Sequence, residues 1–192
     1  MRLFIAVDLD DAVRRHAGRL AERLARDLEP GARRAISWVS PRNMHLTLRF
    51  LGEVEPAAAA EVVGCLSGRL ATPAFRVTTG SVGAFPPSGP PRVIWLGFSS
   101  GAEELSALQR EIEARLGGHG LPREERPFRA HLTLGRIKGV VGVRARDVLA
   151  ALVPSPVAEC AVDHVTLYES HLSPKGPTYT ALARSVLSGV PA

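Results

Sequence analysis

Cysteine is scarce in this chain, and long hydrophobic runs are missing. The 192 residues include only Cys65 and Cys160, which lie far apart without a metal-ligand spacing, so we expect two buried, reduced thiols. The longest early apolar run, Leu3 to Val7, is too short for a secretory signal and is followed by the acidic Asp8 and Asp10. No stretch is long enough to span a membrane, and we therefore expect a cytoplasmic protein without a membrane partner.

Lysine is also rare. Of the 24 basic residues only Lys138 and Lys175 are lysines, and no basic run is longer than a pair. The net charge of +5 and the pI near 10 permit a polyanionic partner such as RNA. A solvated arginine-rich surface explains the same charge equally well, so charge alone does not identify the partner.

Strand-like and helix-like segments alternate along the chain without a dividing linker. We expect one domain, residues 1–192, of two pseudo-symmetric lobes that correspond to about 1–88 and 89–192, separated near the proline- and glycine-rich stretch 86–91. Each half reads β-α-β-α-β, which predicts an α+β fold. We expect strands over 3–9, 35–39, 44–52, 75–85, 92–98, 128–137, 161–170 and 179–187, and helices over 12–28, 56–70, 103–116 and 144–152.

The tetrapeptide His-Leu-Thr-Leu occurs twice, in "NMHLTLRFLG" (43–52) and in "RAHLTLGRIK" (129–138). Random placement of the six His, eight Thr and twenty-three Leu predicts about 0.004 copies of the tetrapeptide, so two copies require an explanation. Their histidines are nearly half a chain length apart. This spacing indicates an internal duplication whose equivalent strands meet at the centre of the molecule.

Together the two copies can perform paired proton transfers that neither copy could perform alone. Because side chains alternate along a strand, His45 and Thr47 face one side while the intervening leucines face the core, and His131 and Thr133 repeat the arrangement. Across a groove, one neutral imidazole can take a proton from water while one imidazolium gives a proton to a leaving oxygen. The two hydroxyls can hold an anion between them. Such a site fits the cleavage of a phosphate ester without a metal.

Other site types fit the sequence less well. Zinc needs three or four ligands, which neither motif supplies, and no serine lies in a Gly-x-Ser-x-Gly turn. A third His-x-Thr sequence begins at His164, but its counterpart in the first half is Ser81, so we interpret His164 as a strand histidine; the alternative is that it lines the groove. We expect His16 and His119 to be solvated, whereas His171, in the loop "SHLSPKGP", could approach the groove but has no pattern behind it.

On both motifs and their surroundings, the chain resembles the 2H phosphoesterases, and among them the bacterial and archaeal RNA 2′,3′-cyclic phosphodiesterases, historically called 2′-5′ RNA ligases. The resemblance extends from "RLFIAVDL" through "WVSPRNMHLTLRFLGEV" and "RPFRAHLTLGRIK" to "VTLYESHLSPKGPTYTAL". It implies a bilobal α+β fold, with two antiparallel sheets around a central groove. It also implies hydrolysis of a 2′,3′-cyclic phosphate to a 2′-phosphate without metal or other cofactor, on RNA ends or small cyclic nucleotides.

The resemblance further implies a role for each motif residue. His45 would be the general acid that protonates the departing 3′ oxygen, and His131 the general base that activates water. Thr47 and Thr133 would bind the non-bridging phosphate oxygens. The residues themselves do not separate the two histidine roles, because the sequence is nearly symmetric in them.

Arg136 and Phe50 are candidates for substrate binding, although strict alternation places both on the core side of their strands. A bulge at Gly135 would turn Arg136 into the groove, where we expect a phosphate-binding arginine. Phe50 stands near a strand end, which suits stacking on a base, but core packing with Leu48 is the interpretation that we favour.

Two alternative functions stay open. One is a 2′-5′ RNA ligase, which would be reversible and inefficient because the sequence has no nucleotide-activating lysine motif. The other is a non-catalytic RNA-binding module that retains a duplicated anion site. Since one chain carries both motifs, we expect a monomer to be sufficient for catalysis.

Overall fold

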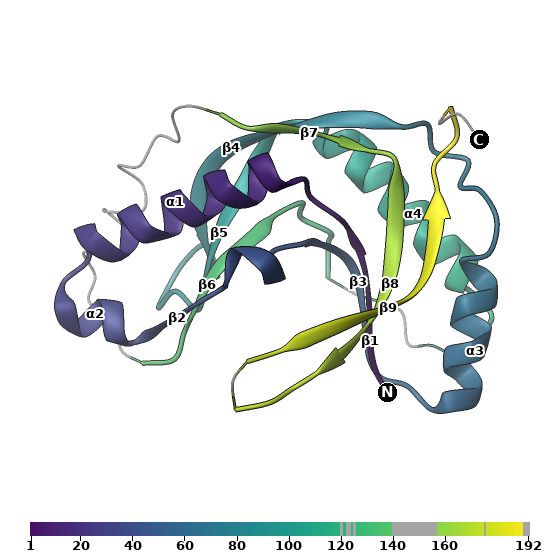
Figure 1. Cartoon of the computed structure of the whole chain (residues 1–192), viewed down its shortest axis with the longest axis horizontal. Coiled ribbons are helices and arrows are strands. Elements are labelled where there is room, and N and C mark those ends of the chain that lie inside the picture. The colour runs from purple at the N-terminus through teal and green to yellow at the C-terminus, as the bar shows by residue number, and fades with distance from the viewer. Residues whose placement is uncertain (120, 122–123, 125, 140–156, 175, 190–192) are drawn as a thin grey trace.

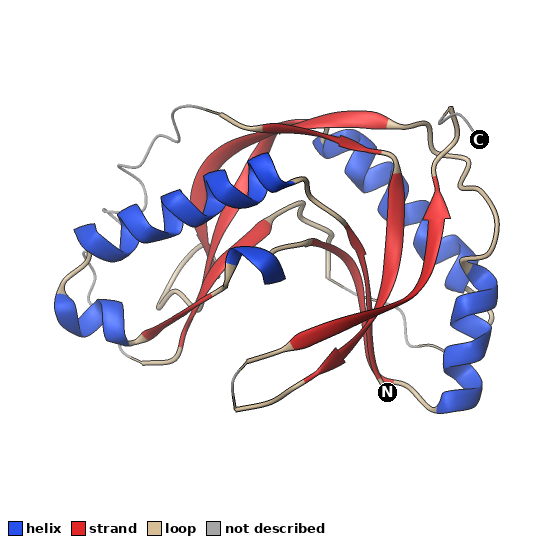
Figure 2. Cartoon of the chain, viewed as in Figure 1, coloured by secondary structure: helices blue, strands red, loops and turns tan. Residues whose placement is uncertain are grey.

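The computed structural model describes residues 1–119, 121, 124, 126–139, 157–174 and 176–189, which form two antiparallel sheets with helices outside them (Figures 1 and 2). This arrangement confirms the predicted α+β fold. One sheet has the strand order β3-β1-β8-β9 and the other the order β2-β6-β5-β4-β7. The strands are β1 (Arg2–Val7), β2 (Ile36–Trp38), β3 (Leu46–Glu53), β4 (Phe75–Phe85), β5 (Val93–Ser100), β6 (Leu132–Ile137), β7 (Glu159–Val162), β8 (His164–His171) and β9 (Thr178–Val186). The helices are α1 (Asp11–Asp27), α2 (Pro30–Arg34), α3 (Pro56–Cys65), α4 (Ala102–Leu116) and the 3₁₀ turn η1 (Pro41–Asn43).

Each of the two long helices packs on a sheet other than the one that contains the strand before it. Helix α1 follows β1 of the four-stranded sheet and contacts β6 and β7 of the five-stranded sheet, whereas α4 follows β5 and contacts β3. The Asp10 side chain accepts the Val13 N–H at 2.8 Å and so caps α1. Residues Ala17, Leu20 and Leu24 continue the buried face of α1, as their spacing predicts.

The first strand holds the four-stranded sheet together because it pairs with β3 on one side and with β8 on the other. Leu3, Ile5 and Val7 are fully buried on its core face. Phe4 and Ala6 alternate to the opposite face, which becomes one wall of the site below.

Several sequence predictions differ from the structure in their boundaries. Pro30 ends the first helix as predicted but also begins α2, since proline suits the first position of a helix. The predicted strand 161–170 divides at Asp163 into β7 and β8, because the chain passes there from one sheet to the other. Helix α3 ends at Cys65, which is partly exposed rather than buried. The predicted helix 144–152 lies outside the described residues.

The two HLTL strands belong to different sheets, β3 to one and β6 to the other, and they contact each other. Each sheet takes strands from both halves of the sequence, so neither sheet corresponds to one half. The division into pseudo-symmetric lobes therefore stays a prediction. In the part of the chain that the structure describes, no helix has both the length and the apolarity of a membrane span.

Candidate active site

The two motif histidines have the same local geometry. His45 precedes β3 and its Nδ1 lies 3.0 Å from the carbonyl oxygen of Asn43, two residues earlier. His131 precedes β6 and its Nδ1 lies 2.7 Å from the carbonyl oxygen of Arg129, again two residues earlier. A carbonyl oxygen only accepts, so Nδ1 carries the proton in both rings. Each Nε2 is thereby left to exchange a proton with a ligand.

Aromatic rings fix the orientation of both imidazoles. The His45 ring stacks on Phe4 with 4.5 Å between the ring centroids, and the edge of Tyr179 meets it at 5.1 Å. The His131 ring meets Phe85 edge to face at 5.1 Å, and Phe85 in turn contacts Trp95. Packing on both rings restricts their rotation, which favours a single direction for each Nε2.

The electrostatic surroundings keep both imidazoles neutral. Burial lowers the pKa of His45 to about 4, although the Asn43 carbonyl raises it. Burial also lowers the pKa of His131, against the raising effect of the Arg129 carbonyl. Arg136 lowers the pKa of both histidines. One guanidinium therefore acts on two imidazoles that come from different sheets, which indicates that all three face the same space.

A β-bulge brings Arg136 to the side of the sheet that carries Thr133. Thr133 pairs with Trp95, but the register between β5 and β6 then shifts and Arg136 pairs with Val93. The extra residue of β6 at this shift is Leu134. Because Val93 and Trp95 point to the same side of β5, Arg136 and Thr133 share that side. Strict alternation, which put Arg136 on the core side, fails here.

A second bulge has the same effect in β3. Thr47 pairs with Ala6, and one extra residue, Leu48, separates that pair from the next. Beyond the bulge Phe50 pairs with Phe4 and is 44% exposed. The expectation that Phe50 packs in the core is therefore wrong, because the bulge reverses the alternation. The Arg2 guanidinium carbon lies 4.9 Å from the centre of the Phe50 ring.

A cavity of about 260 Å³ opens beside His45, and sequence reasoning did not identify its acidic residue. Asp8 accepts hydrogen bonds from His164 Nε2 at 3.0 Å, Thr166 Oγ1 at 2.7 Å and Tyr168 Oη at 2.6 Å. The sequence feature that could have identified Asp8 as part of the site was the third His-x-Thr, which we interpreted as an ordinary strand sequence because the first half has no matching histidine. The residues that line this cavity are Asp8, Arg14, Arg42, Asn43, Met44, His45, Tyr168 and Tyr179.

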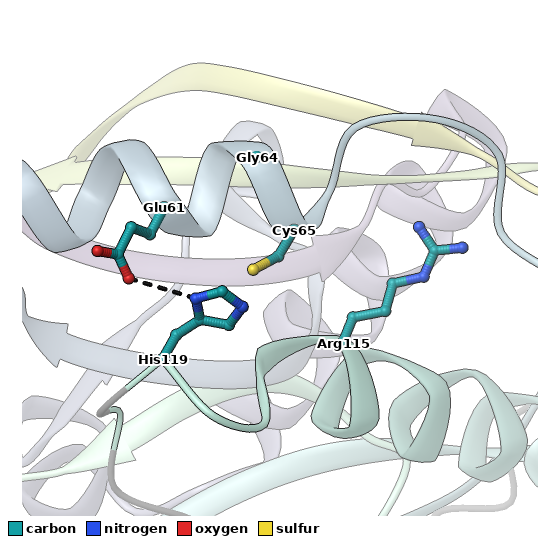
Figure 3. A pocket seen from close by; sticks show the side chains of 5 residues that line it. All are labelled: Glu61, Gly64, Cys65, Arg115 and His119. Atoms are coloured by element: carbon teal, nitrogen blue, oxygen red, sulfur yellow. Dashed lines mark hydrogen bonds and ion pairs between the residues drawn. The ribbon is translucent and has the colours of Figure 1, made fainter.

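A wider cavity of about 640 Å³ lies between α3 and the end of α4, away from both motifs (Figure 3). Its walls hold Cys65 and His119, and His119 Nδ1 lies 3.2 Å from a carboxylate oxygen of Glu61. Burial raises the pKa of the Cys65 thiol, so the unreactive thiol form dominates. His119 has a carboxylate partner where we expected only solvent.

Among the residues that the structure describes, the other histidines and the possible metal ligands form no second candidate site. His16 is 7% exposed in α1, contrary to the expected solvation, and burial lowers its pKa. His171 Nε2 lies 3.4 Å from Glu169 at the end of β8. Within the described residues, no group of three or more His, Cys, Asp or Glu side chains is arranged to hold a metal ion.

Known proteins with similar sequences and structures share one family. The family model of the 2′-5′ RNA ligase superfamily matches residues 7–174. A protein of Thermotoga maritima named RNA 2′,3′-cyclic phosphodiesterase is 36% identical over 190 residues, 98% of this chain and 97% of that protein. One of the same name from Archaeoglobus fulgidus is 35% identical over 182 residues, 95% and 98% of the two chains. The crystal structure of E. coli LigT complexed with 3′-AMP is similar at a TM-score of 0.76 and 30% identity, over 97% of this chain and 98% of that chain.

Proposed function

We propose that this chain, which belongs to the 2′-5′ RNA ligase superfamily, hydrolyses RNA ends that carry a 2′,3′-cyclic phosphate to ends that carry a 2′-phosphate. Relatives about 35% identical over nearly the whole chain are named RNA 2′,3′-cyclic phosphodiesterase. The observation that carries the proposal is the pair of histidines, each bonded through Nδ1 to a carbonyl and each with a pKa that Arg136 lowers. One copy of the chain supplies both.

The third His-x-Thr sequence supports anion binding by the other two. His164 Nε2 and Thr166 Oγ1 lie 3.0 and 2.7 Å from the same oxygen, Oδ2 of Asp8. Two side chains spaced two residues apart on one strand thus converge on a single anionic oxygen. The two HLTL pairs have the same spacing and chemistry, so we infer that they converge in this way on the oxygens of a phosphate.

Hydrolysis requires a base on one side of phosphorus and an acid on the other. Nε2 of neutral His131 takes a proton from water as the water oxygen attacks phosphorus. The bond from phosphorus to the 3′ oxygen breaks, and protonated His45 gives its Nε2 proton to that oxygen. Thr47 and Thr133 donate hydrogen bonds to the non-bridging oxygens, and Arg136 offsets their charge. The phosphate stays on the 2′ oxygen, and exchange with solvent restores both protonation states.

Bound substrate itself favours the protonated form of His45, the proposed general acid. In the free protein the pKa of His45 is about 4, so little of the imidazolium is present at neutral pH. A bound phosphate places a negative charge beside the ring and favours its protonated form. Every step uses only side chains and water, so the proposal predicts turnover in the presence of EDTA.

Two single variants test the proposal. His45→Ala and His131→Ala should each lower kcat on a cyclic-phosphate RNA by roughly 10²- to 10⁴-fold, the usual contribution of a general acid or base, while KM changes little. His119→Ala, in the other cavity, is the matched control and should keep wild-type turnover. Turnover that persists in either motif variant would refute the paired mechanism. Binding without turnover by the wild-type protein would favour a binding module, and net joining of ends would favour a ligase.

A further inference from the structure

Asp8 carries a negative charge in the groove that the mechanism above does not use. It follows β1 and lines the same cavity as His45. Burial raises the pKa of its carboxyl group, but hydrogen bonds from His164, Tyr168 and Thr166 outweigh burial and lower that pKa to about 2. The carboxylate is therefore ionised over the whole range in which an enzyme of this kind would act.

His164 is held between two carboxylates. Its Nε2 lies 3.0 Å from Asp8, and its Nδ1 contacts Asp163. Donation from both nitrogens requires a protonated ring, but Nδ1 also lies 2.8 Å from a guanidinium nitrogen of Arg184, which can only donate. Burial acts to lower the pKa of His164, but the hydrogen bonds to Asp8 and Asp163 raise it, and nearby Arg184 opposes them. The third His-x-Thr thus binds an anion that belongs to the protein itself.

The charges around the two motif histidines differ. Around His45, Asp8 favours the protonated ring, whereas Arg136 of β6 and Arg14 of α1 oppose it. The charge that acts on His131 is Arg136, a cation. The other polar groups that line the cavity at His45 are Arg42 and Asn43 of η1, Tyr168 of β8 and Tyr179 of β9. The two motifs match in sequence and in their Nδ1 contacts, and Asp8 is an anion that acts on His45 and not on His131.

We propose that Asp8 is a positioning residue: held ionised by His164, Thr166 and Tyr168 in the cavity that it shares with His45, it offsets part of the effect of burial and of the nearby arginines on that ring and so favours His45 as the proton donor. The proposal rests on the proposed function, because it concerns which histidine donates a proton and which accepts one in that reaction. It also explains how a nearly symmetric pair of motifs can perform two opposite proton transfers. Aromatic contacts connect the two parts, since Tyr168 and His45 both stack on Phe4, at 5.3 and 4.5 Å between ring centroids.

Asp8→Asn tests this role because it removes the charge and keeps the size. Loss of the carboxylate lowers the pKa of His45, by about one unit for a single nearby charge. In the enzyme–substrate complex, the alkaline limb of the kcat profile reports the acid, so this limb should move to lower pH by about one unit in Asp8→Asn, with kcat about tenfold lower above the limb and unchanged below it. A purely structural defect would lower kcat by the same factor at every pH.

Two controls separate the charge from the contacts around it. Asp163→Asn alters the other carboxylate at His164, which does not line the cavity, and should keep the wild-type pH profile. Tyr168→Phe removes one donor to Asp8 but leaves the carboxylate charged at pH 5 to 8, and should also keep the shape of the profile. NMR titration of the His45 ring, without substrate, should show a lower pKa in Asp8→Asn than in the wild type.

The outcomes distinguish this inference from the function on which it rests. If the wild-type protein turns over the RNA and Asp8→Asn has an unshifted profile and an unshifted His45 titration, the role of Asp8 is refuted and the function stands. If the wild-type protein has no turnover at any pH, the proposed function itself fails. An alkaline limb displaced to lower pH in Asp8→Asn alone, together with a lowered pKa of His45, supports both.

Discussion

A fall in pH should lower the free energy of unfolding because His45 is buried as the neutral imidazole, and the size of the loss follows from its lowered pKa. Burial lowers the pKa of His45 to about 4 in the folded protein, whereas an unfolded histidine titrates near 6.5. Between these values the unfolded chain binds the proton more readily, so stability is lost as the pH falls from about 6.5 towards 4. The two pKa values give a loss of about 2 kcal/mol at pH 5 and about 3 kcal/mol at pH 4.

His45→Gln isolates this contribution because glutamine cannot be protonated and can still donate to the Asn43 carbonyl. The free energy of unfolding, measured by urea titration at pH 7 and pH 5, should fall by about 2 kcal/mol less in the variant than in the wild type. His119→Gln removes an imidazole outside the groove and should behave as the wild type does. Equal losses in His45→Gln and the wild type would show that His45 is not held neutral by burial, and the account of its environment would be wrong.

Three further variants test the groove. Arg136→Leu removes a cation beside both motif histidines, so their pKa values should rise by NMR titration and KM for the RNA should rise about tenfold; an unchanged KM would argue against a phosphate contact. Gly135→Val should lower the free energy of unfolding by about 1 to 3 kcal/mol in urea, since a Cβ there would lie 2.8 Å from Ile36 Cγ2; a neutral result would show that the bulge adapts freely. Phe50→Ala should change stability by less than about 0.5 kcal/mol, because the ring is exposed, and a loss above about 2 kcal/mol would restore the core interpretation.

The helices and strands could be predicted from the sequence because each shows a residue periodicity within its own segment. The helix face of Val13, Ala17, Leu20 and Leu24 and the fully buried residues of β1 follow from spacings of about 3.6 and 2. The same local rule failed at the two bulges. An extra residue in β3 or β6 is defined only relative to the neighbouring strand, so alternation misplaced both Arg136 and Phe50.

The Asp8 network was beyond sequence reasoning for a different reason. It joins residues 156 positions apart, and they meet only because β8 pairs with β1 in the sheet. The histidine pair could be found because it repeats, whereas the network occurs once. A repeated motif thus indicated the candidate site residues, whereas the contacts of Asp8 depend on topology.

Phosphorus NMR of a single reaction tests the central claim most directly. Wild-type protein is incubated in EDTA with an RNA oligonucleotide that ends in a 2′,3′-cyclic phosphate, and the isomer of the product is identified. We expect conversion to the 2′-phosphate alone, because the acid serves the 3′ oxygen. A 3′-phosphate product, or no product at any pH from 5 to 9, would contradict the account of two histidines that divide the proton transfers between them.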